Sequence, residues 1–259
     1  MSAAVLEIKD LRVYYHTRHG PVKAVDGVSF SLAQGERLGL VGESGSGKSS
    51  LLRVILALER AQSGQVRLLG EEFSSAKGEK LRRLRRAVQA VFQDPYSSFD
   101  PKWTVERLIG EPFFLLSSPP SADERRRKVA VVLEQVGLSA ADARRLPQEF
   151  SGGERQRIAI ARALITEPAV IVFDEAVSAL DVLLREQIIK LLAELAQRLN
   201  LAYLFVSHDL HVIRALADRV YVMQKGRIVE EGPTETVFAS PRHAYTQALM
   251  AAAPRLQVN

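Results

Sequence analysis

The stretch RLGLVGESGSGKSSLLRVILAL, Arg37 to Leu58, decides the fold of this 259-residue chain. It opens with the short apolar run Arg37 to Val41, which is typical of a buried strand. The segment Gly42 to Ser49 then matches a known pattern: glycine, four residues, glycine, lysine and serine or threonine. The residues from Ser49 to Leu58 have the apolar spacing of a helix. A strand, a glycine-rich turn and a helix in this order predict a phosphate-binding loop.

Each part of this loop has a chemical task. Glycines let the backbone wrap around a phosphate chain with its amides pointing inward, and the following helix adds the positive end of its dipole. Lys48 is expected to reach the outer phosphates, and Ser49 is expected to ligate Mg²⁺. The residues expected to bind a nucleotide here are Gly42, Glu43, Ser44, Gly45, Ser46, Gly47, Lys48, Ser49 and Ser50.

Strand and helix patterns alternate along much of the chain. Three further apolar runs, Val88 to Phe92, Ala169 to Phe173 and Ala202 to Val206, have the composition of buried strands. From Val182 to Leu199, leucine and isoleucine recur at three- and four-residue spacing, which predicts an amphipathic helix. The alternation predicts an α/β fold with a mainly parallel sheet flanked by helices, whose ligands bind at the carboxyl ends of the strands.

Two regions depart from this alternation. The segments Leu6 to Tyr15 and Val22 to Leu32 alternate as strands, which predicts an N-terminal antiparallel β subdomain. From Pro95 to Phe150 the strand pattern is lost, and helices are expected at Val105 to Leu115 and Ser121 to Val136, so we expect an inserted helical subdomain. The predicted organisation is one domain over 1–259: a core with its β subdomain at 1–94 and 151–240, helices at 95–150, and a short tail at 241–259.

Composition excludes several classes of protein. A hydrophobic content of 47% and a charged content of 25% argue against a disordered, collagen-like or coiled-coil chain. The absence of cysteine excludes disulfides, thiol nucleophiles and thiolate metal sites. No apolar run approaches the roughly 18 to 20 residues that span a bilayer, and the first residues do not resemble a secretory signal. We therefore expect a cytosolic location.

Two carboxylates follow the strand expected at Ala169 to Phe173. At the end of a strand beside the phosphate loop, Asp174 would hold the metal, and Glu175 would polarise an attacking water as a general base. The alternative is that the pair caps a helix. The phosphate loop favours the first interpretation, so nucleotide hydrolysis is the predicted chemistry.

The segment FSGGERQ, Phe150 to Gln156, resembles the signature of the ATP-binding subunits of ABC transporters. Further motifs stand in that family's order: Gln93 after a strand, Ser178 to Asp181 after Glu175, and His208 after another strand. The resemblance covers nearly the whole chain. It implies a P-loop NTPase of ABC type that hydrolyses ATP with Mg²⁺.

The resemblance also implies roles for single residues. Gln93 would contact Mg²⁺ or the attacking water, and His208 would contact the γ-phosphate. Tyr15 is similar in position to the aromatic residue that stacks on adenine, and Tyr14 is its competitor because a one-residue strand error swaps faces. The expected catalytic residues are Lys48, Gln93, Glu175 and His208, and the expected metal ligands are Ser49, Gln93 and Asp174.

In this family the signature binds the γ-phosphate of ATP held by the other subunit. Ser151, Gly152, Gly153 and Glu154 would do so here, and Asp181 would help to connect the two sites across the interface. The resemblance thus implies two ATPases that close head to tail and drive two membrane permease subunits from the cytoplasmic face of the membrane. Glu154 stands where glutamine is commonest; at the first turn of a helix it complements the dipole, so tuned affinity is expected.

Two segments resemble one branch, the oligopeptide, dipeptide and nickel importers: FQDPYSSFDP, Phe92 to Pro101, and PRHAYTQALM, Pro241 to Met250. The first is similar to the second of two paired ATPases, which implies a heterodimer; a homodimer is the alternative. The solute would be a di- or oligopeptide, nickel or a related small solute, delivered by a solute-binding protein. Tyr96 and Phe99 are expected either to contact the permease or to pack the helical subdomain.

Two other functions compete with import: a soluble ABC ATPase acting on nucleic acid or ribosomes, and the ATPase of a split exporter. The basic runs Lys80 to Arg86 and Arg125 to Lys128 are what a nucleic-acid hypothesis would use. Solvated helix faces explain them more simply, because no aromatic set is interleaved with the charges. No nucleic acid is expected as a partner.

Overall fold

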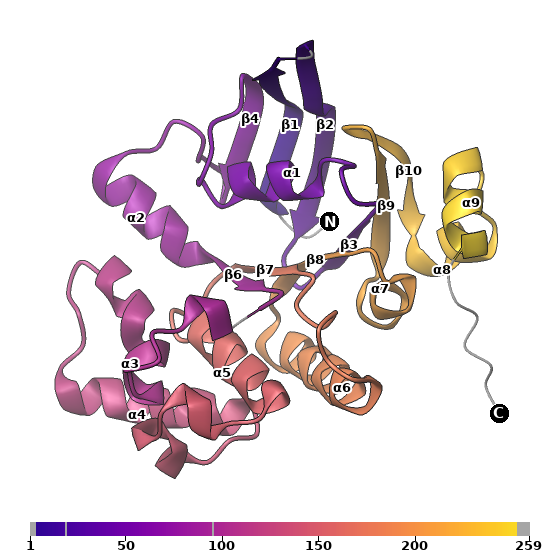
Figure 1. Cartoon of the computed structure of the whole chain (residues 1–259). Coiled ribbons are helices and arrows are strands. Elements are labelled where there is room, and N and C mark those ends of the chain that lie inside the picture. Colours follow the sequence, from indigo (N-terminus) through magenta and orange to yellow (C-terminus); the bar gives the residue numbers. More distant parts are fainter. Residues whose placement is uncertain (1–3, 19, 95, 253–259) are drawn as a thin grey trace.

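The computed structural model describes residues 4–18, 20–94 and 96–252, and two sheets organise them (Figure 1). The larger sheet has six strands in the order β10-β9-β3-β8-β7-β6, of which only β10 is antiparallel to its neighbour. Its strands are β3 (Arg37–Val41), β6 (Val88–Phe92), β7 (Val170–Asp174), β8 (Ala202–Ser207), β9 (Arg219–Gln224) and β10 (Arg227–Pro233). The predicted mainly parallel sheet is confirmed, with strand ends displaced by at most one residue.

The smaller sheet is antiparallel and confirms the predicted N-terminal β subdomain. Its order is β2-β1-β4-β5. The strands are β1 (Ala4–Thr17), β2 (Gly20–Ala33), β4 (Ser63–Leu68) and β5 (Glu71–Glu72). One hydrophobic core contains side chains from both sheets and from helix α1 (Lys48–Ile55), which lies between them. This helix ends before the predicted Leu58, and Ala57 has a left-handed backbone with φ of 52°.

Helices α5 (Gly152–Leu164), α6 (Val182–Leu199) and α7 (Leu210–Leu216) cover the other face of the six-stranded sheet, in a second core. The predicted bounds of α6 are confirmed at both ends. Asp181 caps it, because its Oδ1 accepts a hydrogen bond of 3.0 Å from the amide of Leu184.

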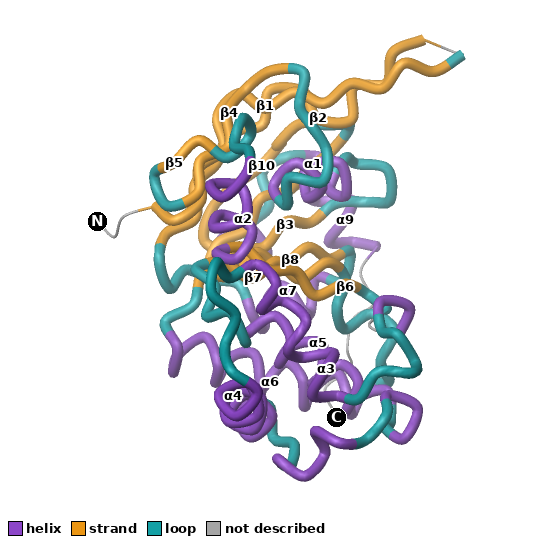
Figure 2. Tube along the Cα trace, turned by 90° about the vertical axis from the view of Figure 1, so that its left-hand side faces the viewer, coloured by secondary structure: helices purple, strands orange, loops and turns teal. Residues whose placement is uncertain are grey.

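Residues 96–150 form helices and turns but no strand. They comprise η1 (Tyr96–Ser98), α3 (Val105–Gly110), η2 (Glu111–Leu115), α4 (Ala122–Gln135), η3 (Ala140–Arg144) and η4 (Pro147–Glu149). The predicted single helix from Val105 to Leu115 is wrong in its second half, which is a 3-10 helix. Pro112 explains the change, because a proline has no amide for the α-helical bond and its ring clashes with the preceding turn. Figure 2 shows the strands above and these helices below.

Three further helices complete the described chain: α2 (Gly78–Ala87), α8 (Thr234–Ala239) and α9 (Ala244–Ala252). Among the helices built from the described residues, none is long and apolar enough to cross a bilayer.

Candidate nucleotide-binding site

The parallel strands bring the predicted site residues to one edge of the sheet. The phosphate loop follows β3, Gln93 follows β6, and Glu175 follows β7. A cavity of about 850 Å³ opens at this edge. It is lined by Tyr15, Pro21, Val22, Lys23, Ala24, Ser44, Gly45, Gly47, Lys48, Ser49, Ser50, Gln93, Asp174, Glu175 and Lys225. The cavity therefore brings six residues of the phosphate loop together with Tyr15, Gln93, Asp174 and Glu175.

Lys48 is folded across the phosphate loop. Its side-chain Nζ donates to the carbonyl oxygens of Gly42 at 2.6 Å and Glu43 at 2.9 Å, and lies 3.4 Å from the hydroxyl of Ser46. The residue is only 7% exposed. Gly42, Glu43 and Ser46 contact this lysine but do not line the cavity.

Gly47 is required by the chain itself. Its φ of +111° is a conformation that side chains rarely adopt, and a Cβ there would lie 2.0 Å from the carbonyl oxygen of Ala24. Gly47 is also the N-cap of α1, and no side chain caps this helix or places an acid in its first turn. The first amides of α1 are consequently available to an anion.

Charges of both signs meet at the cavity: a buried lysine and two half-buried carboxylates. Burial lowers the pKa of Lys48, while Glu175, Asp174 and Glu43 act to raise it. Burial also raises the pKa of Asp174, the charge of Glu175 adds to that effect, and Lys48 opposes it. The two adjacent carboxylates therefore favour a cation between them and the loop.

The donor set fits Mg²⁺. Ser49, Gln93 and Asp174 would supply a hydroxyl, an amide and a carboxylate oxygen, which are the hard oxygen ligands that this ion prefers. Within residues 4–252, apart from 19 and 95, no group of three or more His, Cys, Asp or Glu side chains could hold a metal. The ion would thus depend on phosphate oxygens to complete its shell, as Mg²⁺ usually does.

Glu175 is held in an uncommon backbone conformation. Its φ is 50°, and its amide donates to the carbonyl of Val206 at 2.9 Å. Its Oε1 lies 2.9 Å from Nδ1 of His208, which follows β8. His208 does not line the cavity itself, so it reaches the site through Glu175. Strain of this kind persists where the surrounding structure imposes it, often at functional sites.

The structure separates the two adjacent tyrosines. Tyr15 lines the cavity, and its hydroxyl donates to Oε2 of Glu59 at 2.8 Å. Tyr14 does not line it: its hydroxyl donates to Oδ1 of Asp26 at 2.6 Å, and this bond, with one from Arg227, lowers the pKa of Asp26 to about 2. Sequence reasoning missed Glu59, because its partner lies 44 residues away and no local pattern announces the contact.

The predicted signature residues lie outside this cavity. Ser151 is the N-cap of α5, and Oε2 of Glu154 accepts bonds of 2.8 Å from both its amide and its hydroxyl. Gly152 is exposed, and a Cβ there would meet nothing within 4 Å. At Gly153, by contrast, a Cβ would lie 3.0 Å from Leu184 of α6. The chain does not bring this segment, or Asp181, to its own phosphate loop.

A contact from the C-terminal part of the chain was also missed. The hydroxyl of Tyr245, in α9, accepts a hydrogen bond of 2.9 Å from the amide of Glu43 in the phosphate loop. Tyr245 belongs to the segment PRHAYTQALM, but no sequence pattern indicated that this segment reaches the loop. The segment that characterises the importer branch thus touches the nucleotide site.

A second cavity, of about 380 Å³, lies between the core and the helical residues 96–150. Its rim includes the exposed apolar side chains of Phe92, Leu58 and Phe114, the last two being 64% and 65% exposed. Phe99 does not line this cavity, because it is 5% exposed and packs in the hydrophobic core. This agrees with the alternative prediction that Phe99 packs the helical subdomain. The side chain of Tyr96 lies outside the described part of the structure.

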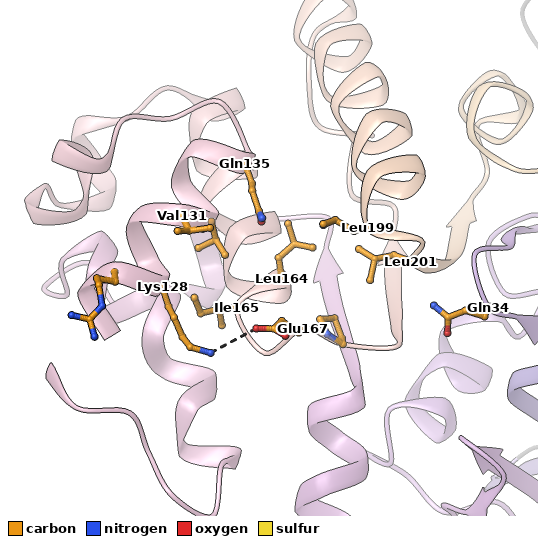
Figure 3. Close-up of a pocket in the computed structure, with 12 residues that line it drawn as sticks. Gln34, Lys128, Val131, Gln135, Leu164, Ile165, Glu167, Leu199 and Leu201 are labelled. Atoms are coloured by element: carbon orange, nitrogen blue, oxygen red, sulfur yellow. Dashed lines mark ion pairs between the residues drawn. The ribbon is translucent and has the colours of Figure 1, made fainter. Parts of the chain in front are cut away.

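A further cavity, of about 510 Å³, shares no residue with the first (Figure 3). It lies between α4 and the ends of α5 and α6, and its floor is apolar, with Val131, Leu164 and Leu201 among its lining residues. Lys128 at its edge is 3.6 Å from Glu167. Without a glycine-rich loop or a group of carboxylates, it lacks the chemistry of the nucleotide site.

Comparison with known proteins agrees with this geometry. The family "ABC transporter" matches residues 25–178, which is more than half of the chain. The chain belongs to the ABC transporter ATPase family. A second family, "Oligopeptide/dipeptide transporter, C-terminal region", matches residues 229–259.

Individual members of the family are similar over nearly the whole chain. The oligopeptide transport ATP-binding protein AppF of Bacillus subtilis is 46% identical over 258 residues, 96% of this chain and 78% of AppF. The dipeptide transport ATP-binding protein DppF of Haemophilus influenzae is 45% identical, over 96% of this chain and 78% of DppF. A dimeric ATP-binding cassette solved in a post-hydrolysis state with ADP and phosphate is 28% identical, with a TM-score of 0.78, covering 88% of this chain and 98% of that one.

Proposed function

We propose that this chain is the ATP-hydrolysing subunit of a di- or oligopeptide importer. The observation that carries ATP hydrolysis is the meeting of the phosphate loop, Gln93, Asp174 and Glu175 around one cavity. Membership of the ABC transporter ATPase family supports the coupling to transport, and the match of residues 229–259 to an oligopeptide and dipeptide transporter region favours peptide over nickel.

ATP would bind with its base on Tyr15 and its phosphates on the amides of α1 and the loop. Stacking needs only the face of the ring, while Glu59 holds the hydroxyl end and so limits how the ring turns. Lys48 would exchange its two carbonyl partners for phosphate oxygens, a stronger charge-assisted contact.

Ser49, Gln93 and Asp174 would hold Mg²⁺, which when bound neutralises phosphate charge. Glu175 would accept the proton of the attacking water. His208, 2.9 Å from Glu175, would hold this carboxylate in position, and it would contact the γ-phosphate from beside Glu175.

A second ATP-binding subunit would complete each site. The support is that Ser151 and Gly152 are exposed at the start of α5 but lie outside the cavity of their own chain. The hydroxyl and amide of Ser151 donate to Glu154 within the chain, so a neighbour's phosphate would have to replace Glu154 as their acceptor. Nothing within the described chain makes use of the space beside Gly152. We propose a heterodimer, with a homodimer as the alternative.

Each of two permease subunits would dock on one ATPase, in the groove between the core and residues 96–150. Its exposed Phe92, Leu58 and Phe114 offer an apolar surface to a short helix, and it lies directly after β6, next to Gln93. The chain would thus lie at the cytoplasmic face of the membrane, and a solute-binding protein would select the peptide.

Substitution of Glu175 tests the hydrolysis step. Glu175→Gln should retain ATP binding, accumulate an ATP-dependent dimer in size-exclusion chromatography, and release phosphate at least about 100-fold more slowly. Glu186→Gln, an exposed carboxylate on α6, is the matched control and should hydrolyse ATP normally. Normal turnover by Glu175→Gln would reject the general-base role.

Co-purification tests the partners. The tagged chain, expressed at its native level and extracted gently from membranes, should carry two permease proteins and a second ATPase, identified by mass spectrometry. An importer would also show peptide-stimulated ATP hydrolysis when its binding protein is added. Ribosomes or nucleic acid in place of a permease would instead support the soluble ATPase, and a permease without a binding protein would support the exporter.

A further inference from the structure

Helix α2 presents an unusually basic outer face. Within its ten residues, the sequence KLRRLRR places Arg85 and Arg86 three and four residues after Arg82, which puts all three on one side of the helix. Leu84 is buried. All three arginines are exposed. We call these three residues the α2 basic face.

The charges of the α2 basic face are not neutralised by neighbouring acids. Glu71 binds Arg83 at 2.6 Å and lies 3.6 Å from Lys80. Glu79 accepts a bond from Ser117 at 2.8 Å. In the part of the chain that the structure describes, no ion pair involves Arg82, Arg85 or Arg86, and Arg85 donates to the carbonyl of Ala57 at 3.0 Å.

The second basic run of the sequence is different. In α4, Arg126 pairs with Asp123 at 3.1 Å and Lys128 pairs with Glu167 at 3.6 Å. Much of its charge is therefore compensated locally. The α2 run has five cations and the α4 run has four, and two in each run are paired. Among the described residues of the two runs, only the α2 basic face leaves three cations outside any ion pair on one side of a helix.

Exposed apolar groups adjoin these cations. Arg85 lines the same groove as Leu58 and Phe114, so open arginines and open apolar side chains share one rim. In Figure 2, α2 lies between the strands and the helices α3 and α4. Cations beside apolar side chains are the chemistry of a surface that meets a membrane interface.

We propose that the α2 basic face binds the anionic phospholipid headgroups of the bilayer beside the permease. The inference rests on the proposed function, since permease docking in the groove turns this side of the chain toward the membrane. Lipid contact would hold the ATPase at the surface and orient the groove toward its permease. Each arginine near such a surface strengthens partitioning about fivefold.

Vesicle co-sedimentation of the full chain tests the proposal without the permease. The chain should bind vesicles of phosphatidylcholine with about 30% phosphatidylglycerol and not vesicles of phosphatidylcholine alone. The double variant Arg82→Gln/Arg86→Gln should bind about 25-fold more weakly, and it leaves Arg85 in the groove untouched. Raising the salt from about 0.1 to about 0.5 M should weaken wild-type binding in the same way.

The matched control removes two charges elsewhere. Lys9→Gln/Arg67→Gln neutralises two exposed residues of β1 and β4, which do not line the groove, and should bind vesicles as the wild type does. Both double variants should bind ATP normally, which excludes misfolding. Equal losses in the two variants, equal binding to neutral vesicles, or tighter binding of a DNA duplex through Arg82 and Arg86 would overturn the lipid assignment. Those outcomes would leave ATP hydrolysis and permease docking standing.

Discussion

The phosphate loop and the signature segment are both glycine-rich starts of helices, yet the chain treats them in opposite ways. At Gly47 a Cβ would lie 2.0 Å from the chain's own backbone, and Lys48 is buried and bonded inside the loop. At Gly152 a Cβ would meet nothing, and Ser151 is exposed. The first region lines a cavity of its own chain, while the second is capped by Ser151 and Glu154 and lies outside that cavity.

This difference shows that the two segments contain glycine for different reasons. In the loop, glycine is needed so that the chain can fold; at Gly152, the folded chain gives no reason for it. A glycine at position 152, where the folded chain has room for a side chain, is explained if another molecule packs against it. The contrast is therefore independent support for the proposal that another subunit's nucleotide lies against α5.

The largest expected effect comes from replacing the glycine at the start of each helix with alanine. Gly47→Ala should lower the free energy of unfolding by about 2–5 kcal/mol, because the new Cβ meets the Ala24 carbonyl and the backbone is left-handed. Gly152→Ala should keep or slightly raise it, by up to about 1 kcal/mol, since alanine favours a helix. Urea unfolding measures both. Equal losses would show that Gly152 also serves folding.

The second prediction separates binding from assembly. Lys48→Ala should weaken ATP binding by the isolated chain about 10- to 100-fold, through loss of a charge-assisted contact. Ser151→Ala should leave that affinity unchanged at low protein concentration but slow hydrolysis by the assembled ATPase. Titration calorimetry and phosphate release distinguish the two. A Ser151→Ala chain that lost ATP affinity as a monomer would place the signature in its own site.

A smaller effect is expected at Tyr15, which lines the cavity beside the phosphate loop. Tyr15→Ala should raise KM for ATP about tenfold, whereas Tyr14→Phe should leave it unchanged, because stacking needs a ring that lines the cavity. Glu59→Gln should raise KM about threefold with kcat unchanged, as expected of a residue that only positions the ring. A fall in kcat with constant KM would contradict this positioning role.

The smallest effect concerns the second region. Glu154→Ala removes the acceptor for Ser151 and should lower the free energy of unfolding by about 0.5–1 kcal/mol. Its bonds from Ser151 hold the pKa of Glu154 below the usual range, so the carboxylate's advantage over Glu154→Gln is present above its unfolded pKa near 4.3 and is lost as pH falls through the lower folded value. Thermal unfolding from pH 7 to pH 3 should show the two melting temperatures converging; a constant gap would contradict it.

Sequence reasoning succeeded where one local pattern dominates. The strands around the site and all of α6 follow from apolar periodicity, and the phosphate loop follows from its spacing. It failed at η2, where Pro112 outweighs the apolar pattern of the segment. Tyr14 and Tyr15 could not be separated, because a register irregularity between Val13 and Tyr14 interrupts the regular pairing with β2.

Other parts of the site depend on contacts between distant residues. Glu59 meets Tyr15 across 44 residues, and Tyr245 reaches the loop across 202. Phe99 resembles an exposed aromatic in sequence but is enclosed by the helical region. No periodicity encodes such pairs, since they arise from how whole elements pack.

Gly153 is packed against Leu184. Leu184 lies only three residues after Asp181, the N-cap of α6, and nine residues after Glu175. Because close packing leaves little room for side chains to shift, we expect the segment after β7 and the start of α5 to move together. The first of these segments carries Glu175, the proposed general base for the attacking water, and the second carries Ser151, which we proposed to contact the nucleotide of a neighbouring subunit. A rearrangement at Glu175 that moves the turn capped by Asp181 would therefore also move Ser151. Through the contact between Gly153 and Leu184, a change in one nucleotide site would reach the site on the neighbouring subunit.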